Sequence, residues 1–120
     1  MKRLSCELLV AGGGVAGCCA AISAARSGVR TLLAERQGYI GGTGYAGMLQ
    51  HICGLYLNGD TAPAETMNEG LSREIAGLLK NTSSKRMVQK IGRVYVLPYA
   101  AADLQDIKLL YGTRVLFLSL

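Results

Sequence analysis

The chain has 120 residues, which is room for about one domain, and half of these residues are hydrophobic. A chain this apolar can bury a core, so the composition excludes an intrinsically disordered protein. The formal net charge is +5, and basic residues gather between Lys80 and Arg93. This stretch contains no aromatic residue on which a nucleic-acid base could stack. We therefore expect it to be a solvated surface, with no nucleic-acid partner.

The first 35 residues predict a strand, a helix and a second strand. Leu8–Ala11 is a short apolar run that ends in glycine, which indicates a buried parallel strand. Val15–Ser27 is rich in alanine and free of proline, as is typical of a helix, and Gly28 suits its carboxyl end. Thr31–Ala34 indicates the second strand, with Glu35 at its end. This order predicts a right-handed βαβ unit, and so an α/β fold with a parallel sheet.

The remaining elements carry weaker signals. Glycine recurs seven times over residues 38–59, which predicts a long glycine-rich loop region, with a short helical turn near Met48–Cys53. Helical spacing of apolar residues, or strand-like apolar runs, predict four further elements. These are helices over Thr66–Leu79 and Ala101–Leu110, and strands over Val94–Leu97 and Val115–Leu118.

Three glycines between the first strand and the helix form the pattern G-x-G-x-x-G. Gly12 allows a tight turn off the strand, Gly14 lets a pyrophosphate approach the backbone, and Gly17 lets the helix lie close to the sheet. The start of the helix offers N–H groups and the positive end of the helix dipole to the phosphates. The pattern and its strand–helix context therefore predict dinucleotide binding.

Glu35 completes this pattern at the end of the second strand. It follows Gly17 by 18 residues, close to the spacing of about 20 at which a carboxylate binds ribose hydroxyls. A carboxylate at this place would repel a 2′-phosphate, which argues against NADP. The βαβ unit does not by itself distinguish FAD from NAD.

The segment ERQGYIGGTGYAG, Glu35–Gly47, resembles the segment that follows the ribose-binding glutamate in flavoproteins with two dinucleotide-binding domains. The chain is similar to the start of FAD-dependent oxidoreductases of the fumarate reductase flavoprotein group, and within that group to the branch of the heterodisulfide reductase flavoproteins. The resemblance is strong over residues 4–47 and loose elsewhere. It implies a Rossmann-like FAD-binding domain, FAD as the cofactor, and a small-molecule substrate or electron partner of unspecified identity.

The resemblance also implies roles for nine residues in FAD binding. The adenosine ribose would be bound by Glu35, and the adenine side would be flanked by Arg36. The pyrophosphate and ribityl chain would lie beside Gly42 and Thr43. The pyrophosphate would also be lined by Gly12, Gly14, Val15, Ala16 and Gly17. For Arg36 a solvated surface position is an equal alternative, and for Gly42 an ordinary turn is the alternative. Gly44 and Leu49 stand where related disulfide reductases carry cysteines, so a flavin–disulfide relay is not implied.

The cysteine and histidine content indicates no metal site. The four cysteines include no CxxC pair, so neither a zinc ribbon nor a thioredoxin-type redox pair is indicated. Unpaired cysteines fit a reducing, cytoplasmic location. His51 is the only histidine, and a loop or packing position is a better interpretation than a proton donor, so the catalytic residues stay unknown. The sequence contains no apolar stretch of about 18 residues, so we expect no membrane partner.

The part of a flavoenzyme that holds the isoalloxazine ring is not recognisable. The resembling family has a substrate domain and a late Gly-Asp motif, and neither is present. We therefore expect residues 1–120 to be an incomplete Rossmann-like FAD/NAD(P)-binding domain, the amino-terminal part of a longer flavoenzyme that is inactive alone. Two other interpretations stay open: the NAD-binding module of a dehydrogenase, and a non-enzymatic protein that binds nucleotides or nucleic acid.

Overall fold

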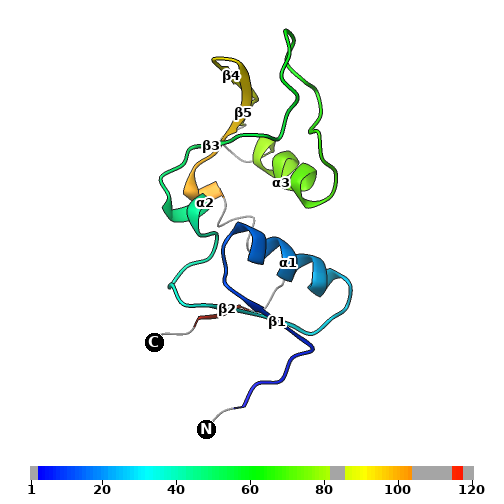
Figure 1. The fold of residues 1–120 in the computed structure, drawn as a ribbon, viewed down its shortest axis with the longest axis vertical. Coiled ribbons are helices and arrows are strands. Elements are labelled where there is room, and N and C mark those ends of the chain that lie inside the picture. The colour runs from blue at the N-terminus through cyan, green and yellow to red at the C-terminus, as the bar shows by residue number, and fades with distance from the viewer. Residues whose placement is uncertain (1–2, 82–85, 104–114, 118–120) are drawn as a thin grey trace. The chain divides into compact units, whose positions relative to one another are not determined.

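The computed structural model describes residues 3–81, 86–103 and 115–117 (Figure 1). The chain divides into two compact units, a first unit of Met1–Met48 with Leu109–Leu120 and a second unit of Leu49–Lys108. The prediction that residues 1–120 form one FAD-binding domain stays a prediction. Among the described residues, no helix is long and apolar enough to cross a bilayer.

The first unit contains a parallel sheet with strand order β1-β2-β6. Strand β1 (Leu8–Ala11) is followed by helix α1 (Val15–Arg26) and strand β2 (Thr31–Glu35), and β6 (Val115–Phe117) pairs with the other edge of β2. Figure 1 shows α1 lying along the β1–β2 pair, which it connects. The predicted α/β fold with a βαβ unit and a parallel sheet is confirmed.

Small residues let α1 lie close to this sheet. Ala21 on the helix and Leu33 at the centre of β2 are both buried. The helix ends at Arg26, one residue before the predicted Ser27, which is its C-cap and donates its N–H to the carbonyl of Ser23 at 3.2 Å. Gly28 follows with a φ of +84°, as predicted for the carboxyl end of the helix. The predicted burial of β1 is wrong, however. Leu9 is 55% exposed, because it alternates with Val10, whose Cγ1 lies near Gly17 of α1, and so it faces away from that helix.

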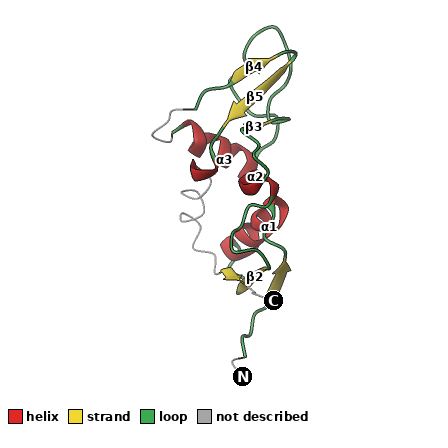
Figure 2. Ribbon diagram, turned by 90° about the vertical axis from the view of Figure 1, so that its left-hand side faces the viewer, coloured by secondary structure: helices red, strands yellow, loops and turns green. Residues whose placement is uncertain are grey.

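The second unit contains an antiparallel sheet with strand order β3-β5-β4. Its strands are β3 (His51–Ile52), β4 (Gln89–Ile91) and β5 (Val94–Pro98), drawn in yellow in Figure 2. The predicted strand over Val94–Leu97 is confirmed as most of β5. The core of this unit consists of buried side chains from β5 and from helix α3 (Leu71–Lys80), among them Val96, Leu97 and Leu79.

Two local predictions are corrected. The helical turn expected near Met48–Cys53 lies earlier, at α2 (Thr43–Ala46), because His51 and Ile52 pair with Pro98 and Leu97 as a strand. Helix α3 (Leu71–Lys80) begins five residues later than the expected Thr66. Gly70, with φ +70° and ψ −144°, cannot continue a helix toward the amino end, and it therefore sets the start of α3.

The two carboxyl-terminal predictions lie partly outside the described residues. Of the helix expected over Ala101–Leu110, residues 101–103 are helical. Of the strand expected over Val115–Leu118, the described part is β6, which pairs in parallel with β2. This pairing brings residues 115–117 back to the βαβ unit.

Candidate dinucleotide-binding site

The glycine loop between β1 and α1 depends on glycine for its backbone shape. Gly12 has a φ of +104°, which other residues rarely adopt, and its N–H donates to the carbonyl of Ala34 at 2.8 Å. A Cβ at Gly17 would overlap the carbonyl oxygen of Gly12 and would lie 3.5 Å from Val10 Cγ1. Gly12 and Gly17 therefore shape the loop and allow α1 to cross it closely.

Gly14 is the residue that opens this loop toward a ligand. It is the N-cap of α1, and its carbonyl accepts the N–H of Cys18 at 2.9 Å as the first helical hydrogen bond. No heavy atom lies within 4 Å of the position a Cβ would occupy at Gly14, and the next two residues, Val15 and Ala16, are exposed. The first turn of α1 contains no acidic residue, so its N–H groups and helix dipole suit an anion.

A second glycine loop lies directly against the first. The Gly41 N–H donates to the carbonyl of Gly13 at 2.6 Å, and Gly14 and Gly41 form a parallel β-bridge. Gly42 has a φ of +49°, and a Cβ there would lie 3.0 Å from Gly14 Cα. Thr43 follows as the exposed first residue of α2. The structure thus brings the predicted Gly42 and Thr43 beside the first glycine loop.

The carboxylate of Glu35 is fixed to the glycine loop by backbone hydrogen bonds. Its Oε1 accepts the Gln37 N–H at 2.7 Å and its Oε2 accepts the Gly13 N–H at 2.6 Å. These N–H groups, Gln37 first and Gly13 second, hold the pKa of Glu35 below its usual value of 4.5, and Arg36 contributes in the same direction. The carboxylate is therefore ionised at neutral pH and keeps lone pairs that can accept ribose hydroxyls.

Gly13 is a site residue that the sequence reasoning missed. A Cβ there would lie 3.0 Å from Ile40 Cγ2 and 3.1 Å from Glu35 Oε2, so the close contact with Glu35 needs glycine. The run of three glycines could have indicated this role, because the G-x-G-x-x-G motif requires glycine at positions 12 and 14 but not at position 13. The carbonyl of Gly13 also accepts the thiol of Cys18 at 3.2 Å.

Arg36 and His51 are two further residues that the sequence analysis considered. The side chain of Arg36 is exposed, and its charge helps to lower the pKa of Glu35. His51 pairs with Pro98 in the second unit. No described group of three His, Cys, Asp or Glu residues could hold a metal ion. The site is thus built mainly from backbone groups and one carboxylate.

Comparisons with known proteins concern the family and the fold of the chain. The family model for FAD dependent oxidoreductases matches residues 7–116. The chain is also similar to the 4-oxocyclohex-2-ene-1-carboxylate 5-dehydrogenase of Sinomonas cyclohexanicum, with 45% identity over 42 residues, which are 35% of this chain and 7% of that protein.

Among solved structures, the fold is similar to that of THI4 from Thermovibrio ammonificans. The TM-score is 0.54 at 18% identity, and the alignment covers 94% of this chain and 38% of the THI4 chain. The chain therefore spans well under half the length of either protein. The family model, which matches most of the sequence, settles the broader relationship: the protein belongs to the FAD dependent oxidoreductase family.

Proposed function

We propose that the first unit binds the ADP half of FAD and that the chain is the FAD-binding part of a flavin-dependent oxidoreductase. The observation that carries this proposal is the 2.6 Å hydrogen bond from the Gly13 N–H to the Glu35 carboxylate. It fixes an ionised acceptor beside the start of α1, and adenosine diphosphate needs both an acceptor for ribose and a helix start for phosphate. Family membership supports FAD as the dinucleotide.

In this proposal the backbone binds the phosphates and one carboxylate binds the ribose. Glu35 would accept the adenosine ribose hydroxyls, and Arg36 would flank the adenine. Bound FAD would supply the hydride or electron transfer, while the described residues would bind and orient its ADP half, and no catalytic residue is proposed. The pyrophosphate and ribityl chain would contact Gly12, Gly14, Val15, Ala16, Gly17, Gly42 and Thr43.

The finer features of the proposal concern the whole protein. The segment from Glu35 to Thr43 supports a place near the branch of the heterodisulfide reductase flavoproteins, and the curated relative is by its name a dehydrogenase, which supports a redox reaction on a small molecule. The four cysteines are free, which fits a reducing, cytoplasmic location.

Calorimetric titration of the purified chain with ADP, FAD, NAD and NADP tests the proposal. We expect ADP and FAD to bind at one site, because most of the proposed contacts are to the ADP half. NADP should bind more weakly than NAD, because its 2′-phosphate would meet the ionised Glu35. A clear preference for NAD over FAD would favour the NAD-binding module instead. A chain that binds none of the four ligands would contradict the dinucleotide site itself.

A further inference from the structure

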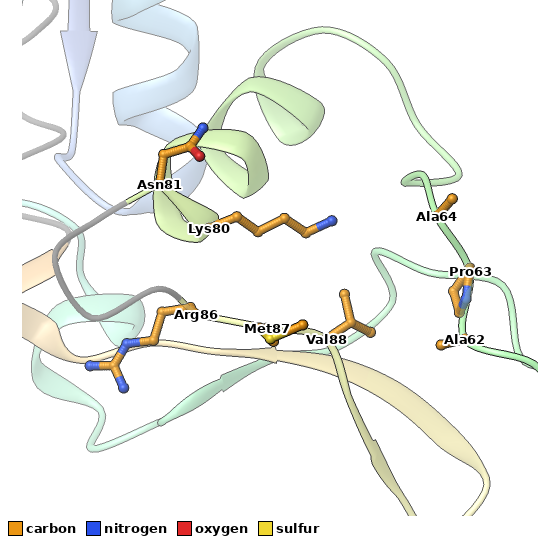
Figure 3. Close-up of a pocket in the computed structure, with 8 residues that line it drawn as sticks. All are labelled: Ala62, Pro63, Ala64, Lys80, Asn81, Arg86, Met87 and Val88. Atoms are coloured by element: carbon orange, nitrogen blue, oxygen red, sulfur yellow. The ribbon is translucent and has the colours of Figure 1, made fainter.

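A pocket in the second unit shares no residue with the dinucleotide site. It has a volume of about 580 Å³ and lies between segment 62–64, the end of α3 and segment 86–88 (Figure 3). That volume is within the range of about 300–1,000 Å³ that is usual for small-molecule sites. Most of its described wall is apolar and consists of Ala62, Pro63, Ala64, Met87 and Val88.

The charged residues of the pocket are both cations. Lys80 and Arg86 line it, and no acidic residue is among its described lining residues. Arg86 is already paired, since its Nε donates to Asp103 Oδ2 at 3.1 Å. Figure 3 shows its guanidinium turned away from Met87 and Val88. The charge of Arg86 is therefore largely compensated by a neighbour.

Lys80 has a different environment. Its side chain extends from the last residue of α3 across the pocket toward Pro63 and Ala64 (Figure 3). Its Nζ lies 5.3 Å from the centroid of the Tyr56 ring, and within the described part of the chain it forms no ion pair. The pocket therefore combines an apolar wall with a lysine side chain that reaches into it and forms no ion pair with any described residue.

We propose that this pocket binds a small carboxylic acid with an apolar body, with its carboxylate at Lys80 and its apolar body against Pro63, Met87 and Val88. The ammonium group supplies a charge-assisted hydrogen bond to the carboxylate, and the apolar wall removes the body of the ligand from water. A compact inorganic anion would leave that wall hydrated, and a cation would be repelled by Lys80. The site is independent of the proposed FAD site, because every described lining residue belongs to the second unit.

The test uses the full chain without flavin and ¹⁹F NMR with 4-fluorobenzoate as the probe. We expect 4-fluorobenzoate to bind and the neutral 4-fluorobenzamide to bind about tenfold more weakly or worse, because only the former gains a charge-assisted hydrogen bond. Lys80→Met should weaken 4-fluorobenzoate binding by a similar factor. Lys90→Met is the matched control, since Lys90 Nζ also lies over a tyrosine ring, 5.4 Å from the centroid of Tyr95, but Lys90 does not line the pocket.

A second variant tests the apolar wall by a different route. Met87 is 75% exposed, so Met87→Glu should leave the fold intact, but it would place a carboxylate beside the bound acid and should reduce its binding. Circular dichroism of each variant checks the fold. The proposal is overturned if 4-fluorobenzoate does not bind at millimolar concentration or if 4-fluorobenzamide binds equally well. It is also overturned if inorganic phosphate displaces the probe at equal concentration, or if Lys80→Met and Lys90→Met bind 4-fluorobenzoate with the same affinity.

Discussion

Gly13 decides where the Glu35 carboxylate lies, although it has no side chain. We expect Gly13→Ala to weaken ADP binding by about tenfold, because the new Cβ would press on Ile40 Cγ2 and Glu35 Oε2 and lengthen the charge-assisted bond to the carboxylate. The same change should raise the pKa of Glu35 toward 4.5, since a hydrogen bond that favours the charged form is lost. Calorimetry with ADP and an NMR titration of the carboxyl group measure the two effects.

Gly38→Ala provides the control for this substitution. Gly38 also lies in the first unit, it has no positive φ, and nothing lies within 4 Å of its Cβ position. Its replacement should change neither the affinity for ADP nor the pKa of Glu35. Equal ADP binding by Gly13→Ala and Gly38→Ala would show that Gly13 does not position the carboxylate.

The lowered pKa of Glu35 predicts a direction for pH dependence. A carboxyl group whose pKa is depressed on folding stabilises the folded state above its unfolded pKa, and this contribution is lost as pH falls through the folded pKa. The bonds from Gln37 and Gly13 should therefore give the NMR titration of Glu35 a midpoint below 4.5. In Glu35→Gln the acid sensitivity of unfolding should decrease. A Glu35 midpoint at or above 4.5 would contradict the hydrogen-bonded arrangement.

Gly14 and Gly17 belong to the same motif but should respond differently to substitution. Gly14→Val adds a side chain in open space, so the fold should persist while ADP binding falls sharply, because the branched side chain would occupy the place of the phosphate. Gly17→Ala would push against the Gly12 carbonyl and should lower the free energy of unfolding by about 1–3 kcal/mol. Urea unfolding and ADP titration of both variants separate these outcomes. Undiminished ADP binding by Gly14→Val would remove Gly14 from the site.

At the scale of elements, local signals predicted the βαβ unit well and the second unit poorly. The strands and helix over residues 8–35 follow from short apolar runs, alanine content and glycine at the turns. Strand β3 has only two residues, His51 and Ile52, and exists because they pair with β5 more than 40 residues later along the chain. The start of α3 depends on the unusual backbone of Gly70, and the apolar spacing before it carried no sign of that conformation.

In the candidate site, too, the sequence predicted the local features but not the long-range contacts. The motif predicted which residues lie near the loop, because the G-x-G-x-x-G pattern constrains the local backbone. The contact of Gly13 with Glu35 links residues 22 positions apart, and the contact of Gly41 with Gly13 joins two separate loops. Such contacts depend on how the elements pack, which the local pattern does not specify.

The β4–β5 hairpin gives a prediction at this scale. Its two-residue loop, Gly92 and Arg93, has a φ of +60° at Gly92, as turns with glycine in first position prefer. Gly92→Ala should lower the free energy of unfolding by about 1–2 kcal/mol, because alanine is strained at positive φ. Gly77→Ala, inside α3 and without positive φ or a close neighbour, should raise it by about 0.5–1 kcal/mol. Thermal unfolding measures both, and equal effects of the same sign would contradict this assignment.

At the scale of the whole molecule, several basic residues of the second unit form contacts within that unit. Arg86 pairs with Asp103, and Lys90 donates to the carbonyl of Gly59 at 3.2 Å while lying over the Tyr95 ring. Lys80 lies over Tyr56 and reaches into the pocket. The basic residues of this stretch therefore contact groups of the protein itself, and binding of nucleic acid would not require such contacts. The expectation that no nucleic acid binds stays a prediction.

The two proposed sites lie in different units, so ligand protection in hydrogen exchange should separate them. ADP at about 100 times its dissociation constant stabilises the state that binds it by about 2.7 kcal/mol. The slowed amides should include residues 13–17 and 41–43, where the backbone itself forms the site. 4-Fluorobenzoate should instead slow exchange near residues 80–81 and 86–88, which line the pocket. In Gly14→Val the first pattern should disappear and the second should persist, and in Lys80→Met the reverse should hold. If either ligand protected the segments assigned to the other, or if one substitution removed both patterns, the assignment of separate sites to separate units would be wrong.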